Sequence, residues 1–151
     1  MYDLERLKGG PNMKKYKIGY TTGVFDMFHI GHLNILKQAK EQCDYLIVGV
    51  STDENVLSYK GKLPVIPFDQ RIEIVGAIRY VDKVVPQTDM DKYKAWEELH
   101  FDALFHGDDW KNSDMYNEII EKFKTVEVDV VFLKHTEGIS SSLLREITKK
   151  K

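Results

Sequence analysis

The sequence has one cysteine and no long apolar run. Because a single cysteine cannot form an internal disulfide, the chain is typical of a protein from a reducing compartment. No stretch approaches the roughly 18 apolar residues that a membrane-spanning helix requires, and no signal-peptide pattern opens the chain. We therefore expect a cytoplasmic protein without a membrane span.

The sequence also lacks an excess of charge of either sign. Its 22 basic and 24 acidic residues give a net charge of −2, which provides no overall field to attract nucleic acid or an anionic membrane. A chain of 151 residues is long enough for one domain whose core needs no disulfides. Residues 1–15 are polar and broken by glycine and proline, so we expect a loosely ordered extension before a domain that spans 16–151.

Short apolar stretches alternate with amphipathic ones along the rest of the chain. They predict strands at 16–22, 45–50, 81–85, 103–105 and 128–133, and helices from 29 onward, after 54, and at 68–80, 91–100, 113–124 and 143–149. We expect Pro86 to close the third strand and 59–64 to form a basic loop. The alternation predicts an α/β fold, a Rossmann-like doubly wound parallel sheet of about five strands with helices on both faces. Functional side chains of such a sheet lie in loops after the carboxyl ends of strands.

The segment 23–32 joins the first strand to the first helix and reads Gly-Val-Phe-Asp-Met-Phe-His-Ile-Gly-His. A helix that begins here presents unpaired N–H groups and the positive end of its dipole, which attract anions. His29 and His32 are three residues apart, so they lie on one face of the first turn and can both donate hydrogen bonds. Gly31 leaves out a side chain where a phosphate would approach the backbone. The segment therefore predicts a polyphosphate-binding turn.

The same two histidines could instead serve as a helix cap or as half of a metal site. A zinc site needs further soft ligands. The single cysteine, Cys43, lies eleven residues after His32, at the end of the same predicted helix. Because no third ligand is close in the sequence, zinc is not favoured.

The turn matches the signature Gly-x-Phe-Asp-x-x-His-x-Gly-His at all six fixed positions. On these residues the chain resembles the cytidylyltransferase branch of the nucleotidylyltransferase superfamily, and the resemblance covers nearly all of 16–147. It implies transfer of CMP from CTP to a small phosphorylated alcohol with release of pyrophosphate, Mg²⁺ that accompanies the triphosphate, and a homodimer. It also implies that His29 and His32 are catalytic and that Lys62 supports them. The turn residues to which it gives nucleotide contacts are Val24, Phe25, His29, Gly31 and His32.

Basic side chains elsewhere match further elements of that family. Two lysines in an exposed loop are usually solvated, but Lys60-Gly61-Lys62 resembles the family's Lys-x-Lys element, which implies that Lys60 contacts the acceptor and Lys62 the triphosphate. Arg71 and the segment Arg79-Tyr80-Val81-Asp82 are similar to family positions that contact substrate or the dimer partner. From the residues alone, Arg79 could simply pair with the nearby aspartate at a helix end. Lys92 falls near an acceptor lysine of the glycerol-phosphate branch, although a solvated helix lysine would look the same.

The stretch His106-Gly107-Asp108-Asp109-Trp110 resembles the Met-Gly-Asp-Asp-Trp stretch of the glycerol-phosphate branch. The resemblance implies that Asp109 and Trp110 hold the nucleotide base, and an indole offers a stacking face to a pyrimidine. Adjacent carboxylates also occur in two-metal and acid–base sites, and one of two such residues often caps a turn.

A cluster of hydroxyl groups precedes the last predicted helix. The stretch 135–142 is similar to the family's Arg-Thr-x-Gly-Ile-Ser-Thr-Thr signature. The nucleotide contacts that this similarity implies are His135, Thr136, Gly138, Ile139, Ser140, Ser141 and Ser142. Hydroxyl and backbone N–H groups at a helix start can hold phosphate oxygens, but a serine-rich cap without a ligand has the same sequence. Because His135 stands where the signature has arginine, we expect nucleotide affinity to be weaker or to depend on pH.

Glycerol 3-phosphate is the favoured acceptor, because Lys60 and Lys92 would repel the cationic group of phosphocholine. A role in the synthesis of cell-envelope precursors would follow. Three alternatives stay open from the sequence. They are another phospho-alcohol such as phosphoethanolamine or phosphocholine, an adenylyltransferase on the same fold, and a nucleotide sensor without catalysis, which the histidine at position 135 would allow.

Overall fold

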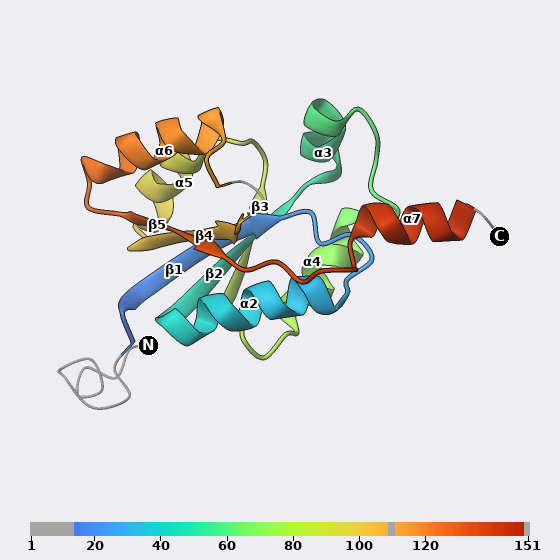
Figure 1. Cartoon of the computed structure of the whole chain (residues 1–151), viewed down its shortest axis with the longest axis horizontal. Helices are drawn as coiled ribbons and strands as arrows, with labels where there is room; N and C mark the ends of the chain where they lie inside the picture. Colours follow the sequence, from blue (N-terminus) through green and yellow to red (C-terminus); the bar gives the residue numbers. More distant parts are fainter. Residues whose placement is uncertain (1–13, 109–110, 150–151) are drawn as a thin grey trace.

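The computed structural model describes residues 14–108 and 111–149, and its parallel sheet has five strands in the order β3-β2-β1-β4-β5 (Figure 1). The strands are β1 (Tyr16–Gly23), β2 (Cys43–Ser51), β3 (Lys83–Gln87), β4 (Ala103–Gly107) and β5 (Asp129–Leu133). The helices are α2 (Ile30–Gln42), α3 (Asp53–Lys60), α4 (Phe68–Gly76), α5 (Lys92–Leu99), α6 (Asp114–Lys124) and α7 (Ser141–Lys149). This arrangement confirms the predicted doubly wound α/β fold.

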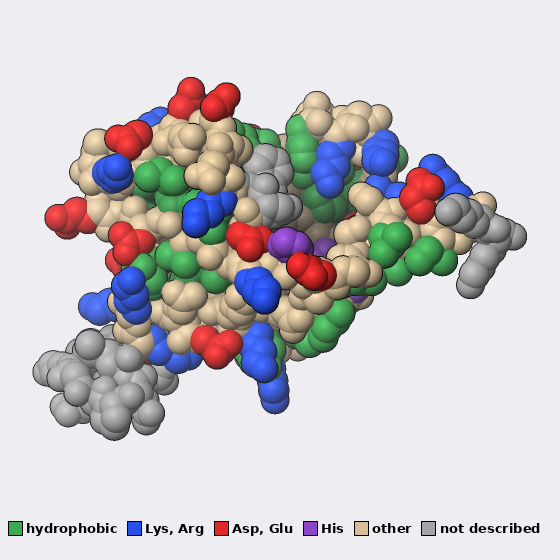
Figure 2. All heavy atoms as spheres, viewed as in Figure 1, with side chains coloured by type: hydrophobic (Ala, Val, Ile, Leu, Met, Phe, Trp, Pro, Cys, Tyr) green, Lys and Arg blue, Asp and Glu red, His purple; other side chains and the backbone are tan. Residues whose placement is uncertain are grey.

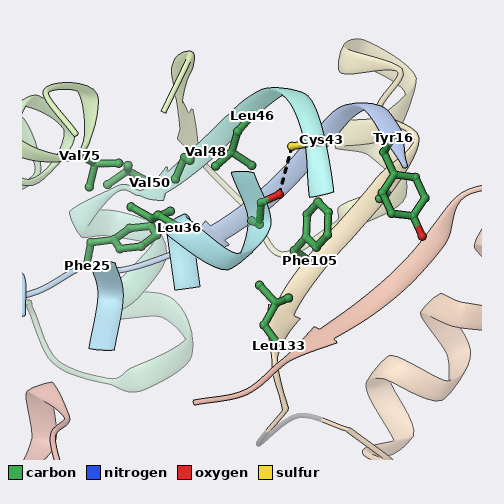
Figure 3. Packing of buried hydrophobic residues seen from close by; sticks show 12 residues of the cluster. Tyr16, Phe25, Leu36, Cys43, Leu46, Val48, Val50, Val75, Phe105 and Leu133 are labelled. Carbon is green, nitrogen blue, oxygen red and sulfur yellow. Dashed lines mark hydrogen bonds between the residues drawn. The ribbon is translucent and has the colours of Figure 1, made fainter. Parts of the chain in front are cut away.

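Helices cover both faces of the sheet, with α2 and α4 on one face and α5 and α6 on the other (Figure 1). Because successive strand residues point to opposite faces, β2 contributes to two cores. Leu46 and Val48 pack with Leu36 of α2 (Figure 3), whereas Ile47 packs with Phe123 of α6. Full burial of side chains of this size contributes about 1.5–3 kcal/mol each, so the central strands are fixed from both sides.

Cys43 is the first residue of β2, whereas we expected it at the end of the preceding helix. Its thiol donates a hydrogen bond to the carbonyl oxygen of Ala39 at 3.3 Å (Figure 3). Burial raises the pKa of this thiol to about 11. Cys43 is therefore a small core residue and not a reactive thiol.

Two predicted loop boundaries are wrong for local reasons. Lys60 lies in the last turn of α3, which Gly61 ends in the left-handed conformation (φ 74°), and not in a loop. Pro86 lies within β3 and does not close it, because Gln87 still pairs with Ser51 of β2. Since β3 is an edge strand, the missing N–H of proline costs no hydrogen bond to a second neighbour.

The helix α4 ends at Gly76, where we expected it to continue to Tyr80. The following residues form tighter turns, in which the amide of Ile78 donates to Val75 O at 3.1 Å and the amide of Val81 donates to Ile78 O at 3.0 Å. This turn brings the chain back to begin β3 at Lys83.

The expected N-terminal extension lies mostly outside the described residues, which begin at Lys14, so its character stays a prediction. Across residues 14–108 and 111–149, no helix combines the length and the apolar character that crossing a membrane would need.

The central strand β1 has neighbours on both sides, β2 and β4. The chain proceeds from β1 to β2 and β3 and then crosses to β4 on the other side of β1. At such a reversal of strand order the loops after adjacent strands diverge and leave a crevice at the carboxyl edge. The histidine-containing turn follows β1 at this point.

Candidate active site

A cavity of about 400 Å³ lies at the carboxyl edge of β1 and β4. Its walls come from the turn after β1, the end of α3, the end of β4 and the segment that leads into α7. Figure 2 shows one face of the molecule, with histidine side chains near its middle, where the surface is hollowed. The predicted site residues that line the cavity are Val24, Phe25, His29, Gly31, His32, Lys60, Lys62, His135, Thr136, Ile139, Ser140, Ser141 and Ser142. Residues far apart in sequence thus meet as the fold class predicted.

The two histidines of the turn cap α2. His29 is the N-cap residue, and its Nδ1 accepts a hydrogen bond from the amide of Gly31 at 3.0 Å. The amide of His29 in turn donates to Nδ1 of His32 at 3.2 Å, and the two rings stack with centroids 3.8 Å apart. Because both Nδ1 atoms accept, a neutral ring carries its proton on Nε2. The cap alternative is therefore correct, and it orients both Nε2–H groups as donors.

Both imidazoles are neutral at pH 7. Burial lowers the pKa of His29 below its usual range. Burial and the neighbouring His29 lower the pKa of His32 to about 3, against the opposing effect of Asp26. Nε2 of His29 is buried and has no protein partner among the described residues. A ligand in the cavity can accept from it, and the hydrogen bond comes from a neutral donor and not from a cation.

Gly31 allows this cap. A Cβ atom at position 31 would lie 2.8 Å from Cε1 and 3.0 Å from Nδ1 of His29, which is too close for the ring to stay in place. We expected Gly31 to make room for a phosphate. The structure adds a second reason for glycine at position 31, because a side chain there would displace the ring of His29 and its Nε2–H donor.

The turn before the cap contains backbone strain. Phe25 and Met27 have φ values of 56° and 49°, a left-handed conformation that costs about 1–3 kcal/mol for a residue with a side chain. The Phe25 side chain is 6% exposed and packs edge-on against His32, with ring centroids 5.4 Å apart. The Phe25 side chain therefore limits the movement of the His32 ring.

Asp26 connects three segments around the cavity. Its carboxylate accepts hydrogen bonds at 2.8 Å from the amides of Val65 and Ile66 and pairs with Arg145 of α7 at 2.7 Å. Its backbone carbonyl accepts from the hydroxyl of Ser141 at 2.6 Å. Burial would raise the pKa of Asp26, but the two amide hydrogen bonds and Arg145 outweigh it and hold the pKa below its usual range. Asp26 is therefore ionised and fixes the loop that follows Lys62 and the start of α7.

We expect the stability that Asp26 provides to depend on pH. A carboxyl group whose pKa is lower in the folded state stabilises the protein above its unfolded pKa of about 4, and this contribution is lost as the pH falls through the folded pKa. Urea unfolding should show wild type to be more stable than Asp26→Asn at pH 7, with a difference that narrows below about pH 4. Asp69→Asn at an exposed position is the control. A difference that does not change with pH would contradict this account.

Arg145 is a cavity residue that the sequence patterns did not indicate. It follows Ser141 by four residues on α7, and this spacing places both side chains on one helix face. Partial burial, together with Arg145 and Lys62, lowers the pKa of Lys60. These three basic side chains form one wall of the cavity and the neutral histidines form another, which suits an anion of high charge.

Arg71 does not contact the cavity, in contrast to its predicted role in substrate binding. Its side chain is 1% exposed, and its guanidinium donates to Ile66 O, Val24 O and Ser51 O at 2.7–2.8 Å and pairs with Asp53 at 2.6 Å. Four of the five N–H groups of this guanidinium are thus engaged by protein groups. Arg71 therefore joins the ends of β1 and β2 to α3 and is a positioning residue.

Arg79 is also outside the cavity. It lies in the turn before β3, at the opposite edge of the sheet, and its Nη2 donates to the hydroxyl of Tyr80 at 2.9 Å. The alternative pair with Asp82 is wrong as well, because Asp82 pairs with Lys40 at 2.6 Å. A substrate contact by Arg79 within one chain is therefore not supported, and its place in a dimer contact stays a prediction.

Lys92 lines a second cavity of about 180 Å³ on the α5 and α6 side of the sheet. It is 5% exposed, so the alternative of a solvated helix lysine is wrong. Burial lowers its pKa to about 8, against the opposing effect of Asp89. Lys60 borders both cavities, so the two spaces adjoin.

Hydrogen bonds hold the segment before α7 at the cavity. Nδ1 of His135 lies 2.5 Å from a carboxylate oxygen of Asp108, and this hydrogen bond lowers the pKa of Asp108. Thr136 accepts from the side chain of Asn34 at 2.8 Å, and Ser140 accepts from the amide of Leu143 at 3.0 Å as a helix cap. Gly138 does not line the cavity, in contrast to its predicted role, but its φ of 81° requires a residue that tolerates the left-handed conformation.

Comparisons with known proteins agree with this geometry. The family model described as cytidylyltransferase-like matches residues 20–147. The glycerol-3-phosphate cytidylyltransferase of Bacillus subtilis is 37% identical over 133 residues, which cover 83% of this chain and 92% of that protein. The ethanolamine-phosphate cytidylyltransferase of Arabidopsis thaliana is 35% identical over 132 residues, 82% of this chain and 30% of that protein.

A solved structure has a similar fold. The lipopolysaccharide core biosynthesis protein from Thermoplasma volcanium has a TM-score of 0.69 at 27% identity, over 80% of this chain and 99% of that one. This chain belongs to the cytidylyltransferase-like family. The family named from the six fixed positions of the turn is therefore confirmed.

Two predicted contacts of this cytidylyltransferase-like protein cannot be placed. Asp109 and Trp110, expected to hold the base, lie outside the described residues.

Within residues 14–108 and 111–149, no three histidine, cysteine, aspartate or glutamate side chains are grouped as a metal site.

Proposed function

We propose that this protein transfers a cytidylyl group from CTP to glycerol 3-phosphate, giving CDP-glycerol and pyrophosphate. The observation that carries the proposal is the pair of adjoining cavities. The first has a polyphosphate-type wall of lysines, arginine and helix N-termini. The second contains Lys60 and Lys92 and no carboxylate among the described residues that line it. A donor and an acceptor that are both anionic fit such a pair.

The triphosphate would occupy the first cavity. Lys62 and Arg145 supply charge there, and the N-termini of α2 and α7 supply backbone N–H groups. We expect Mg²⁺ to enter with the triphosphate, because this ion keeps much of its water shell and binds mainly through substrate phosphates. Among the described cavity residues Asp26 offers a carboxylate, but it is engaged by two amides and an arginine. Asp109 and Trp110 remain our choice for the base contacts.

The reaction would need no general base. A phosphate oxygen of the acceptor, already ionised at pH 7, forms a bond to the α-phosphorus while the bond from that phosphorus to the bridging oxygen breaks. The electron pair leaves with pyrophosphate. Catalysis would then rest on in-line positioning and on donors aimed at the charge that develops. The Nε2–H groups of His29 and His32 suit this role, because neutral donors do not need to exchange a proton.

The acceptor is the finer part of the proposal, since relatives of this chain carry names with either glycerol 3-phosphate or ethanolamine phosphate as acceptor. Phosphoethanolamine and phosphocholine bring a cationic group, which a site would stabilise with carboxylates or an aromatic cage. Lys60 and Lys92 would instead repel that group. A polyol phosphate lacks the positive charge and can use the paired side chains of Ser51 and Gln87, which also line the second cavity.

Pyrophosphate release should be measured with CTP, ATP, GTP and UTP, each against glycerol 3-phosphate, phosphoethanolamine and phosphocholine. We expect turnover with CTP and a kcat/KM for glycerol 3-phosphate that exceeds those of the amines by tenfold or more. A tenfold preference for either amine would refute the acceptor assignment. Turnover with ATP in place of CTP would indicate an adenylyltransferase, and CTP binding without turnover would indicate a sensor.

Acceptor binding should weaken as the pH rises above 8. Lys92 has a pKa of about 8 and loses its charge there, so we expect the KM for glycerol 3-phosphate to rise up to about tenfold between pH 7 and pH 9. Lys92→Arg keeps its charge over this range and should show a smaller change. Initial rates at saturating CTP provide the measurement. A KM that is constant to pH 9 in wild type would remove Lys92 from the acceptor site.

A further inference from the structure

His106 lies at the boundary between the two cavities. The residues that border both are Thr22, Gly23, Val24, Lys60 and His106. In a transfer reaction the donor phosphate and the acceptor phosphate must meet, so the reacting atoms belong at this boundary. Side chains there are within reach of one phosphate or the other.

The fold aims the imidazole of His106 at this boundary. Along β4, Phe105 belongs to the core on the α2 side and Leu104 to the core on the α5 side, and strand alternation places His106 on the same face as Leu104. Its ring packs against Tyr116 of α6, with centroids 5.1 Å apart. Tyr116 is 1% exposed and fully packed, so it limits where the imidazole can move.

His106 and Lys60 approach the boundary from opposite sides. Lys60 ends α3, which follows β2, and His106 lies in β4, while β1 runs between these two strands. Two phosphate groups brought together repel each other. A cation on one side and an imidazole on the other can each hold a non-attacking oxygen of the acceptor and leave the third oxygen directed at the α-phosphorus.

We propose that His106 donates a hydrogen bond to the phosphate of the acceptor and is an acceptor-binding residue of this protein. The inference rests on the proposed function. It also distinguishes this chain from the Met-Gly-Asp-Asp-Trp stretch that 106–110 resembles, because a methionine in this position has no donor.

Steady-state kinetics with His106→Met and His106→Gln test the proposal. Methionine removes the donor at similar size, whereas glutamine keeps one. We expect His106→Met to raise the KM for glycerol 3-phosphate at least about tenfold, the scale of losing one hydrogen bond to a charged group. The KM for CTP should change less than about threefold. His106→Gln should recover most of the acceptor affinity. His100→Asn, at an exposed position on the C-terminus of α5, is the matched control.

A spectroscopic measurement does not depend on turnover. The chain has five histidines, and His106→Gln identifies the imidazole NMR signal of His106. With CMP in the nucleotide cavity, adding glycerol 3-phosphate should shift this signal, whereas CMP alone should not.

The outcomes are separable. Normal wild-type turnover with an unchanged acceptor KM in His106→Met would overturn this inference alone, as would a larger effect on the KM for CTP than on that for the acceptor. Wild type without turnover on any nucleotide and phospho-alcohol would overturn the proposed function and this inference with it.

Discussion

His32→Ala is expected to lower kcat by about a hundredfold to a thousandfold, the effect of removing one preorganised donor from a site where charge develops. The KM for CTP should change much less, because the variant leaves Lys62 and Arg145, which we propose to hold the triphosphate, unchanged. Initial rates of pyrophosphate release over a range of CTP concentrations separate the two parameters.

His29 requires a variant that keeps the helix cap. His29→Asn retains an acceptor for the amide of Gly31, which asparagine provides well at an N-cap, but removes the Nε2–H donor. We expect the same loss of kcat as in His32→Ala and little loss of stability. His100→Asn is the control for a histidine outside the cavity. Turnover at the wild-type rate in either cavity variant would show that these histidines do not act on the reacting phosphate.

The protonation of His29 and His32 determines how the rate should depend on pH. With a pKa of about 3 for His32 and a lowered pKa for His29, protonation of the pair lies below the neutral range. The kcat should therefore not follow a titration of either ring between pH 7 and pH 8. Such a titration assigned to either ring would mean that the cap hydrogen bonds are broken during catalysis.

The second large effect concerns stability. Arg71→Ala should lower the free energy of unfolding by about 3–5 kcal/mol, because it leaves Asp53 without its partner and the carbonyl oxygens of Val24, Ser51 and Ile66 without donors. A domain of this size has only about 5–15 kcal/mol of stability in total. Urea unfolding followed by tryptophan fluorescence or circular dichroism measures the loss.

The matched control is Arg79→Ala, an exposed arginine that sequence similarity placed in the same role. We expect little change in the free energy of unfolding of the isolated chain. If Arg71→Ala does not fold, Arg71→Lys keeps one positive charge and should be folded but less stable than wild type. Equal stability of Arg71→Ala and Arg79→Ala would contradict the positioning role of Arg71.

Local patterns predicted the elements of the fold and the turn of the site well. The alternation of apolar stretches is repeated along the chain, and the six fixed positions of the turn lie within ten residues, so both are visible without knowing the tertiary structure. The errors in α4 and β3 lie at boundaries, where a Gly-Ala turn and an edge-strand proline override the simpler pattern.

Roles that depend on distant contacts could not be predicted in the same way. Arg145 and Asp26 are 119 residues apart, and the sequence gives no sign that they pair. Arg71 looked like Arg79 in sequence, and only the packing around it distinguishes a buried structural guanidinium from an exposed one. The burial of Lys92 likewise follows from the way α5 lies on the sheet.

The contacts of Asp26 also determine when the turn can be completed during synthesis. β1 and β2 are adjacent in the chain and can pair early, with α2 between them. The turn, however, obtains its hydrogen bond from Ser141 and its ion pair from Arg145 only when residues 115 and 119 positions later have been made. A nascent chain that ends before α7 can hold much of its sheet but lacks both contacts. The turn at 23–32 is therefore completed only after the residues of α7 have been made.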